Sequence, residues 1–305
     1  MIRQIKVGEV DLIDPIMTKF GQESDIALPP NFVERIKSSV KDGKTFLYGA
    51  FTENNKLEGI GAFGSISKRM SFVYSRGNSE LDLQLIDTIF RNHSACNSYL
   101  GAAGPWVSAA ISNRLVEHGF RKLDRAYMTL DRNSIIALER PVLTGNMEIE
   151  LYDSSQINEL SELIFKGNDG HIDQIVFPNF FGTTELCKEL IENIENNVYG
   201  EYKKPYSWLL RENNKLVGAC LMTIRNRGDT GYIPDIVIDP EYQGRGLGKA
   251  ILIHSMKELL SGESDIAKIG LDVTLENNAR FLYQSLGYET VNEYSMYTWL
   301  NKKND

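Results

Sequence analysis

Cysteine is scarce in this chain of 305 residues, which contains only Cys96, Cys187 and Cys220. The three are far apart, odd in number and without a CxxC pair, so they give no disulfide framework. No histidine stands near them at a spacing that would complete a zinc site. We therefore expect no metal centre, and three buried thiols that behave as small apolar side chains.

Long apolar runs are also missing, and the segment Met1–Lys6 leads into strand-like residues without the apolar core of a secretory signal. These absences predict a cytoplasmic protein with no membrane partner. The formal net charge of −8 disfavours nucleic acid as a partner and weakly favours a cationic acceptor. The length is comfortable for two domains.

What the sequence does contain is three alternating glycines, Gly244, Gly246 and Gly248. A strand-like apolar run precedes them, and the apolar spacing within Ala250–Leu260 predicts a helix directly after them. Glycine permits positive φ and a close approach of ligand to backbone, so successive amides can point at one anion beside the positive end of the helix. The pattern therefore predicts an anion site, and a pyrophosphate suits it best.

Two other phosphate loops fit this stretch poorly. A Walker loop needs a hydroxyl after its lysine, and Ala250 follows Lys249 here. A dinucleotide fingerprint needs its third glycine one position later than Gly248, within a repeated βαβ frame that the sequence does not show. A glycine-rich helix entry with no ligand is the remaining alternative.

The order Gln-x-x-Gly-x-Gly, filled by Gln243, Gly246 and Gly248, resembles the acyl-CoA-binding motif of the GNAT acyltransferase superfamily. A second stretch downstream is similar to another motif of that family, through the spacing of Ala279, Tyr283, Gly287 and Tyr288. Asn277 stands one residue after the family's usual asparagine position, which Glu276 occupies. The resemblance implies an α/β fold with a mixed sheet.

Strand and helix patterns in the C-terminal half follow the order that this fold requires. Strands are predicted at 147–152, 206–211, 216–223, 232–238, 269–274 and 293–300, with the last closing the sheet, and helices at 153–165, 183–196, 250–260 and 277–286. Pro234 cannot donate to a strand ladder, and the resemblance implies that its strand carries a bulge and splays from its neighbour.

The N-terminal half looks like a second copy of the same plan. The predicted hairpin 45–63, with the turn Glu53–Lys56, matches the later hairpin around Glu212–Lys215. Because Ser75–Ser79 has a single glycine and Leu115 stands where Tyr283 stands, we expect no CoA site in this half. We predict a degenerate GNAT-like domain at 1–142 and a GNAT domain at 143–305, joined near 141–146; an unrelated first α/β domain is the alternative.

The resemblance also assigns roles to individual residues. Backbone amides around Ile236, Val237 and Ile238 would hold the pantetheine arm and the thioester, Asn277 would contact the cofactor, and the pyrophosphate would bind at Gln243, Gly244, Arg245, Gly246, Leu247, Gly248 and Lys249. Tyr283 would be the general acid, since a phenol is protonated at neutral pH. Asp235 is our candidate base, and His171 is a candidate for the acceptor pocket. The aromatic run Phe177–Phe181 would line that pocket or fill core.

The expected activity is transfer of an acetyl or other acyl group from acyl-CoA to a primary amine by direct attack in a ternary complex. The acceptor would be a small molecule or a peptide. A non-catalytic acyl-CoA sensor is the alternative, and it would keep the glycine loop while making Tyr283 dispensable.

Overall fold

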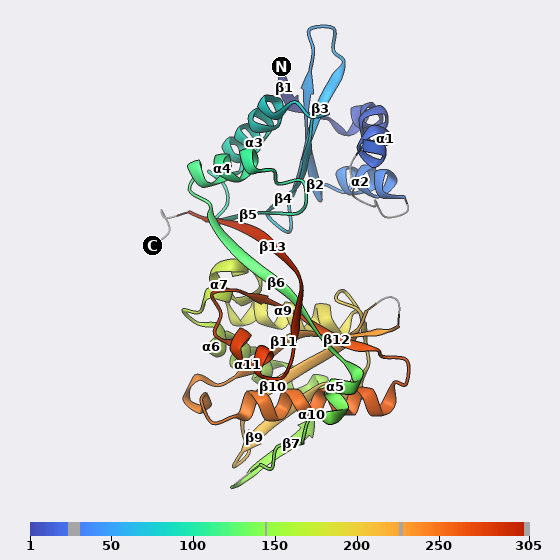
Figure 1. The fold of residues 1–305 in the computed structure, drawn as a ribbon. Helices are drawn as coiled ribbons and strands as arrows, with labels where there is room; N and C mark the ends of the chain where they lie inside the picture. The colour runs from blue at the N-terminus through green and yellow to red at the C-terminus, as the bar shows by residue number, and fades with distance from the viewer. Residues whose placement is uncertain (24–30, 144, 226–227, 302–305) are drawn as a thin grey trace. The chain divides into compact units, whose positions relative to one another are not determined.

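The computed structural model describes residues 1–23, 31–143, 145–225 and 228–301. The chain forms two compact units. Unit 1 comprises Met1–Leu123 and Ser295–Asp305, and unit 2 comprises Asp124–Tyr294. Each contains both parallel and antiparallel strand pairs, with helices packed on both faces of its strands (Figure 1).

Unit 1 is built on strands in the order β1-β2-β3-β4-β5, followed by the second half of β13. These elements are β1 (Ile2–Gln4), η1 (Val7–Ile13), α1 (Asp14–Glu23), α2 (Phe32–Lys41), β2 (Thr45–Phe51), β3 (Leu57–Gly64), β4 (Arg69–Tyr74), α3 (Ser79–His93), β5 (Tyr99–Ala103), α4 (Ala109–Glu117) and β13 (Glu289–Leu300). Helices α1 and α2 bury one face of the sheet, and α3 and α4 bury the other.

Unit 2 has the strand order β7-β9-β10-β11-β12-β6, with β8 beside β10. Its elements are β6 (Arg121–Asp131), α5 (Arg132–Ala137), β7 (Met147–Leu151), η2 (Ser154–Gln156), α6 (Ile157–Asn168), α7 (Ile172–Val176), α8 (Pro178–Phe181), α9 (Thr184–Glu195), β8 (Glu201–Tyr202), η3 (Lys204–Tyr206), β9 (Trp208–Glu212), β10 (Lys215–Ile224), β11 (Thr230–Ile238), η4 (Pro240–Tyr242), α10 (Leu247–Gly262), β12 (Lys268–Thr274) and α11 (Ala279–Ser285). Helices α6 and α9 cover one face, and α10 covers the other (Figure 1).

The two halves of the chain exchange strands. The partner of β12 is β6, with Lys268 opposite Asp131 and Thr274 opposite Arg125. The last part of β13 pairs instead with β5, from Met296 opposite Ala103 onward. The prediction that 293–300 closes the sheet of the C-terminal half is therefore wrong for residues 296–300, and the domain boundary near residue 142 stays a prediction. Hydrophobic alternation marks a segment as a strand but does not name its partner.

Most local predictions agree with the structure. The hairpin turn between β9 and β10 has positive φ at Asn213 and Asn214, the geometry that suits a two-residue turn. The helix after the glycines begins at Leu247, three residues before the predicted start. The two short helices α7 and α8 are not predicted, because neither is long enough to show periodicity. The expected junction 141–146 contains no helix or strand, and its residue 144 lies outside the described part.

The cysteines need one correction. Cys187 and Cys220 are buried as predicted, and burial raises the pKa of each thiol to about 12. Cys96 is exposed, because it lies in the turn after α3 rather than on a core-facing position.

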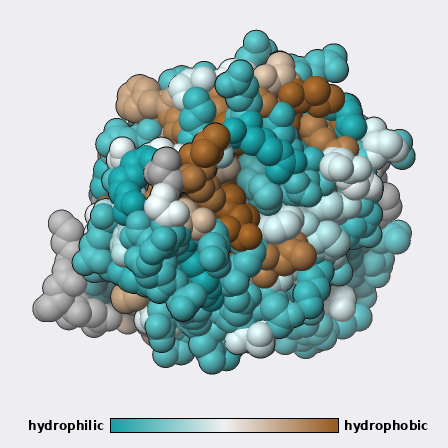
Figure 2. Space-filling model, turned by 90° about the horizontal axis from the view of Figure 1, so that it is seen from below, coloured by the Kyte–Doolittle hydropathy of each residue, from teal (hydrophilic) through white to brown (hydrophobic). Residues whose placement is uncertain are grey.

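The exposed apolar residues of the surface do not identify a binding partner. Among the described residues, no helix is both long and apolar enough to cross a bilayer. Figure 2 shows an apolar strip bordered by polar side chains on the face seen from below. Exposed large apolar residues of unit 2 include Ile136, Val142 and Leu151. Single exposed apolar residues are ordinary on protein surfaces, so they indicate no partner.

Candidate functional site

Strand β11 is bulged and splayed, as the family resemblance implies. Opposite β10, Tyr232 pairs with Thr223 and Asp235 pairs with Leu221, so Ile233 and Pro234 stand against a single residue. Its parallel pairing with β12 runs only from Thr230 to Tyr232. Beyond that point β11 keeps β10 alone as its ladder partner within the described sheet. The backbone edge that faces β12 is therefore left without a strand at 236–238.

The glycine turn has the backbone geometry of an open cradle. Gly244 and Gly246 have φ of 75° and 78°, and Gly246 is the N-cap of α10 without a side-chain cap. A Cβ placed on either glycine would meet nothing within 4 Å. Amides at the start of a helix lack intrahelical acceptors and lie at its positive end. The turn therefore has both the room and the donors for an anion.

The side chains of this turn are less available than its backbone. Arg245 forms an ion pair with Glu212 at 2.7 Å, and Gln243 donates to the carbonyl of Ile238 at 3.2 Å. Lys249 is exposed on the first turn of α10. The cationic charge at the cradle therefore comes mainly from Lys249 and the helix end, while Arg245 is already partly neutralised.

Asp235 is the carboxylate with the most unusual environment. Its Oδ2 is buried and has no hydrogen-bond partner. Burial, assisted by the negative charge of Asp173, raises the pKa of Asp235 to about 7. A carboxylate with this pKa is present in both protonation states near neutral pH, which is the condition for an effective general base.

Asp173, at the start of α7, is a residue that the sequence does not single out. Its carboxylate accepts hydrogen bonds from the hydroxyl of Thr274 at 2.7 Å and the amide of Asn277 at 2.6 Å. Arg125 lies 3.9 Å away and packs over the ring of Phe177 at 4.6 Å. Burial raises the pKa of Asp173, but His171, Thr274 and Arg125 together outweigh it and hold the pKa below its ordinary range. Asp173 is therefore a fixed negative charge.

His171 lies beside this charge. It caps α7, and its Nδ1 is 3.5 Å from the carboxylate of Asp173. The interaction of its ring with the carboxylate of Asp173 raises the pKa of His171, and it outweighs the opposing effect of burial. The structure thus brings His171 to the same group of residues, with its ring about two-fifths exposed.

Tyr283 packs in the apolar cluster on the α10 side of the sheet, and the charges of Asp173 and Asp235 act on its phenol. The residue is buried, and burial followed by the charge of Asp173 raises the pKa of its phenol well above the ordinary value. Its hydroxyl makes no hydrogen bond to another described residue. Tyr283 is therefore a protonated donor with its proton uncommitted.

Asn277 has partners inside the protein. Its Oδ1 accepts the backbone N–H of Ala279 at 2.8 Å while its Nδ2 donates to Asp173. These bonds place Asn277 at the entry to α11, where it orients Asp173. Contact with a cofactor remains a prediction. Of the aromatic run, Phe181 fills core and Phe177 supports Arg125.

Part of the chain is similar to proteins of a known family. Residues 172–288 match the model of the Acetyltransferase (GNAT) family. GCN5-related N-acetyltransferase 2, chloroplastic, of Arabidopsis thaliana is 35% identical over 79 residues, which cover 26% of this chain and 29% of that protein. A ribosomal protein bS18-alanine N-acetyltransferase of Haemophilus influenzae is 36% identical over 83 residues, covering 27% of this chain and 53% of that protein. The chain thus spans about half or less of these curated relatives.

Two solved structures resemble almost the whole chain. A GCN5-related N-acetyltransferase from Sphaerobacter thermophilus has a TM-score of 0.61 at 13% identity, covering 98% of this chain and 95% of that one. A tandem GNAT protein from the clavulanic acid biosynthesis pathway has a TM-score of 0.57 at 13% identity, covering 98% of both chains. At this identity the likeness shows the fold, a mixed α/β sheet that occurs twice.

Proposed function

We propose, on the premise that residues 172–288 form a GNAT-family acetyltransferase domain, that unit 2 transfers an acetyl group from acetyl-CoA to a primary amine. The observation that carries the proposal is Asp235, which stands on the splayed strand β11 with one unpartnered buried oxygen and a pKa of about 7. Tyr283 supplies the complementary protonated group.

The chain offers acyl-CoA a place to bind. The uncapped amides of the turn at Gly244 and Gly246 suit the pyrophosphate, because a Cβ there would meet no atom and the backbone is open to a ligand. The edge of β11 at 236–238, which has lost β12 as a partner, suits the amide-rich pantetheine arm. Acyl-CoA is the acyl donor and the second substrate.

The reaction requires three proton transfers. An alkylamine is mostly protonated at neutral pH, with an ordinary pKa of about 10.4. Asp235 accepts its first proton, directly or through water, and the neutral nitrogen attacks the thioester carbonyl. The new C–N bond forms as the C–S bond breaks, and Tyr283 donates its proton to the departing sulfur. The nitrogen then gives its second proton to the Tyr283 phenolate, and Asp235 releases its proton to solvent, so one amide, one thiol and one proton are produced for each turnover.

Asp173 acts through Asp235 rather than on the substrate. Its charge keeps the proton affinity of Asp235 high, and its bonds to Thr274 and Asn277 hold it in place. We therefore assign Asp173 as a positioning residue. His171 stays a candidate for acceptor contact, because its ring is partly exposed beside this carboxylate.

The pH dependence follows from the raised pKa of Asp235. Activity needs the deprotonated carboxylate, so kcat/KM should be constant above about pH 7 and fall about tenfold per unit below it. In Asp173→Asn the neighbouring negative charge is gone, and the midpoint should move to lower pH. Measuring kcat/KM from pH 5 to 9 for both proteins checks this; an unmoved midpoint would show that Asp173 does not tune the base.

Removing only the phenolic oxygen tests the acid. Tyr283→Phe keeps the ring packing, and kcat should fall about a hundredfold or more at a nearly constant KM for acetyl-CoA. Tyr288→Phe is a matched control, since Tyr288 is also buried and its hydroxyl is bound to the sulfur of Met256. If Tyr283→Phe retains the wild-type kcat, another group or water protonates the thiolate.

Unit 1 is expected to bind no CoA. The helix corresponding to α10 is α3, and one amide of its first turn is already engaged, because the side chain of Asn78 accepts the N–H of Leu81. Strands β4 and β5 pair only at Arg69 and Met70, but Trp106 packs against the core clusters on both faces of that sheet. A stoichiometry of one CoA per chain follows.

The sensor alternative makes a different prediction about turnover. A sensor would bind acetyl-CoA tightly and acetylate no amine in a broad panel. An enzyme would release free CoA thiol with at least one amine, and Tyr283→Phe would slow that release.

A further inference from the structure

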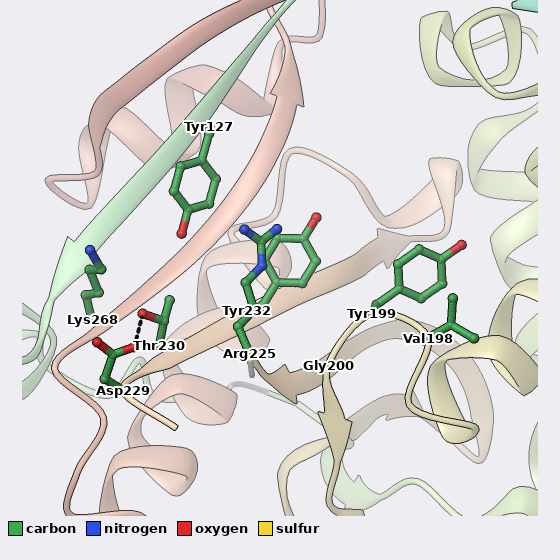
Figure 3. Close-up of a pocket in the computed structure, with 9 residues that line it drawn as sticks. All are labelled: Tyr127, Val198, Tyr199, Gly200, Arg225, Asp229, Thr230, Tyr232 and Lys268. Carbon is green, nitrogen blue, oxygen red and sulfur yellow. Dashed lines mark hydrogen bonds between the residues drawn. The ribbon is translucent and has the colours of Figure 1, made fainter. Parts of the chain in front are cut away.

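Unit 2 contains a pocket of about 510 Å³ at the N-terminal ends of β11 and β12 (Figure 3). Small-molecule sites are commonly of this size, with a few fixed polar groups in an otherwise aromatic or apolar wall. Its lining includes Tyr127, Tyr199 and Tyr232, together with the charged side chains of Arg225, Asp229 and Lys268. None of these six is among the residues that the sequence singles out.

Arg225 is held in a fixed orientation. Its guanidinium lies 3.8 Å from the ring centroid of Tyr232 and 5.0 Å from that of Tyr127 (Figure 3). It touches Asp272 through one nitrogen at 3.4 Å, and the side chain remains 41% exposed. A guanidinium has five N–H donors, so most of them remain for a ligand in the pocket.

Two further charges of opposite sign lie on the rim. Lys268 stands across the β11–β12 ladder from Thr230, the residue after Asp229. The carboxylate of Asp229 accepts only the hydroxyl of Thr230 at 2.9 Å, and neither Asp229 nor Lys268 has an ion-pair partner among the described residues. The pocket therefore offers two cations and one free carboxylate to the same ligand.

The pocket opens on the face of the sheet that carries Asp235. Thr223 and Leu221 lie on one face of β10, and because of the bulge their partners Tyr232 and Asp235 do so too. Two residues along an antiparallel strand correspond to about 7 Å. Asp235 does not itself line the pocket, but the guanidinium of Arg225 lies over the ring of Tyr232, so a charged head held there and an amine at Asp235 would be separated by about 7–10 Å.

Hydrogen bonds connect the pocket wall to the carboxylates of the site. Tyr232 donates to Asp272 at 2.9 Å, and Tyr294 donates to the other oxygen of Asp272 at 2.9 Å. Arg125 donates to the hydroxyl of Tyr294 at 3.2 Å and also lies beside Asp173. The pocket wall is therefore connected through polar contacts to Asp173, the carboxylate whose charge acts on Asp235.

We propose that this pocket binds the zwitterionic head of the acceptor, and that the acceptor is a diamino acid whose side-chain amine is acylated. The carboxylate lies between Arg225 and Lys268, the α-ammonium faces Asp229, and the terminal amine reaches Asp235. A simple carboxylate would leave Asp229 uncompensated, and a polyamine would meet two like charges. This inference rests on the proposed acyl transfer to an amine.

Three amines of similar length test the charges one at a time. 2,6-Diaminohexanoate carries the full head, 6-aminohexanoate lacks the α-ammonium, and 1,5-diaminopentane lacks the carboxylate. With the full-length chain and acetyl-CoA, kcat/KM should fall in that order, by about tenfold or more at each step. Equal efficiency for 1,5-diaminopentane and 2,6-diaminohexanoate would overturn the proposal.

Substitutions in the pocket should act selectively. Arg225→Gln and the exposed Lys268→Gln should raise KM about tenfold or more for the two carboxylates relative to 1,5-diaminopentane, with little change in kcat. Asp229→Asn should weaken 2,6-diaminohexanoate more than 6-aminohexanoate. Asp265 is an exposed carboxylate outside the pocket, so Asp265→Asn should leave KM unchanged for all three amines. An equal loss of kcat/KM for all three amines would mean that these residues support the fold rather than bind the head group.

A binding measurement separates this inference from the proposed function. Calorimetry of 2,6-diaminohexanoate with Asp235→Asn, alone and combined with Lys268→Gln, reports head-group binding without turnover. Binding that requires Lys268 in a protein that acetylates no amine would support the pocket and sink the transferase. Turnover of other amines, with no binding of 2,6-diaminohexanoate, would support the transferase and sink the pocket assignment.

Discussion

Replacing Asp235 with asparagine is expected to lower kcat by about 100-fold to 10,000-fold, the range associated with loss of a positioned general base. Asparagine keeps the size of the side chain but cannot accept a proton from the amine. Affinity for acetyl-CoA should stay within about twofold, because the turn at Gly244 and Gly246 is untouched. Steady-state kinetics with the best amine of a panel, together with calorimetry of CoA, measure the two quantities separately.

The same substitution has a second readout in stability. The folded protein raises the pKa of Asp235 from its ordinary value near 4 to about 7, so ionised Asp235 weakens the fold progressively as pH rises through that interval. Asp235→Asn should therefore have the same Tm as the wild type at pH 4 and a higher Tm at pH 8. The rise should be about 2–4 °C for each kcal/mol gained in the free energy of unfolding. Asp265→Asn, which is exposed, should change neither kcat nor this difference. If Asp235→Asn is inactive but has the wild-type Tm at pH 8, then ionised Asp235 does not destabilise the fold and the raised pKa is contradicted.

Replacing Gly246 with glutamate is expected to weaken CoA binding by about two to four orders of magnitude. The new side chain and its charge would occupy the open space before α10, and loss of two amide bonds to an anion is worth about 1.5–3 kcal/mol each. Calorimetric titration of the folded variant with CoA measures the change.

Gly77→Glu in unit 1 is the matched control. Gly77 has φ of 81° and open space around it, so the backbone strain of the substitution is the same as at Gly246. CoA affinity should be unchanged in Gly77→Glu. Wild-type affinity in a folded Gly246→Glu protein would contradict the assignment of the turn, and a matching loss in Gly77→Glu would relocate the site.

Sequence reasoning succeeded where chemistry is local. The glycine turn and the helix start at Thr183 each follow from backbone preferences of a few consecutive residues, whereas the bulge at Pro234 was implied by the family resemblance. It missed Asp173, because the charge that tunes Asp235 comes from a five-residue helix sixty residues earlier, with no periodic pattern to mark it.

It missed the pocket for a related reason. Arg225, Asp229 and Lys268 are ordinary surface charges in sequence, and only the register of β10, β11 and β12 places them around one cavity. The exchange of β6 and β13 was equally hidden, since strand alternation is the same whichever neighbour a strand pairs with.

The exchanged strands also set the order in which the sheets can be completed during synthesis. Strand β5 ends at Ala103, whereas its partner residues in β13 begin at Met296. At about 5–20 residues per second, a ribosome needs roughly 10–40 s to make the roughly 190 residues between them. Through that interval one edge of β5 lacks its native neighbour and is open to wrong pairing. Strand β6 waits as well, because its partner β12 begins only at Lys268, but that wait ends before the residues of β13 that pair with β5 are made.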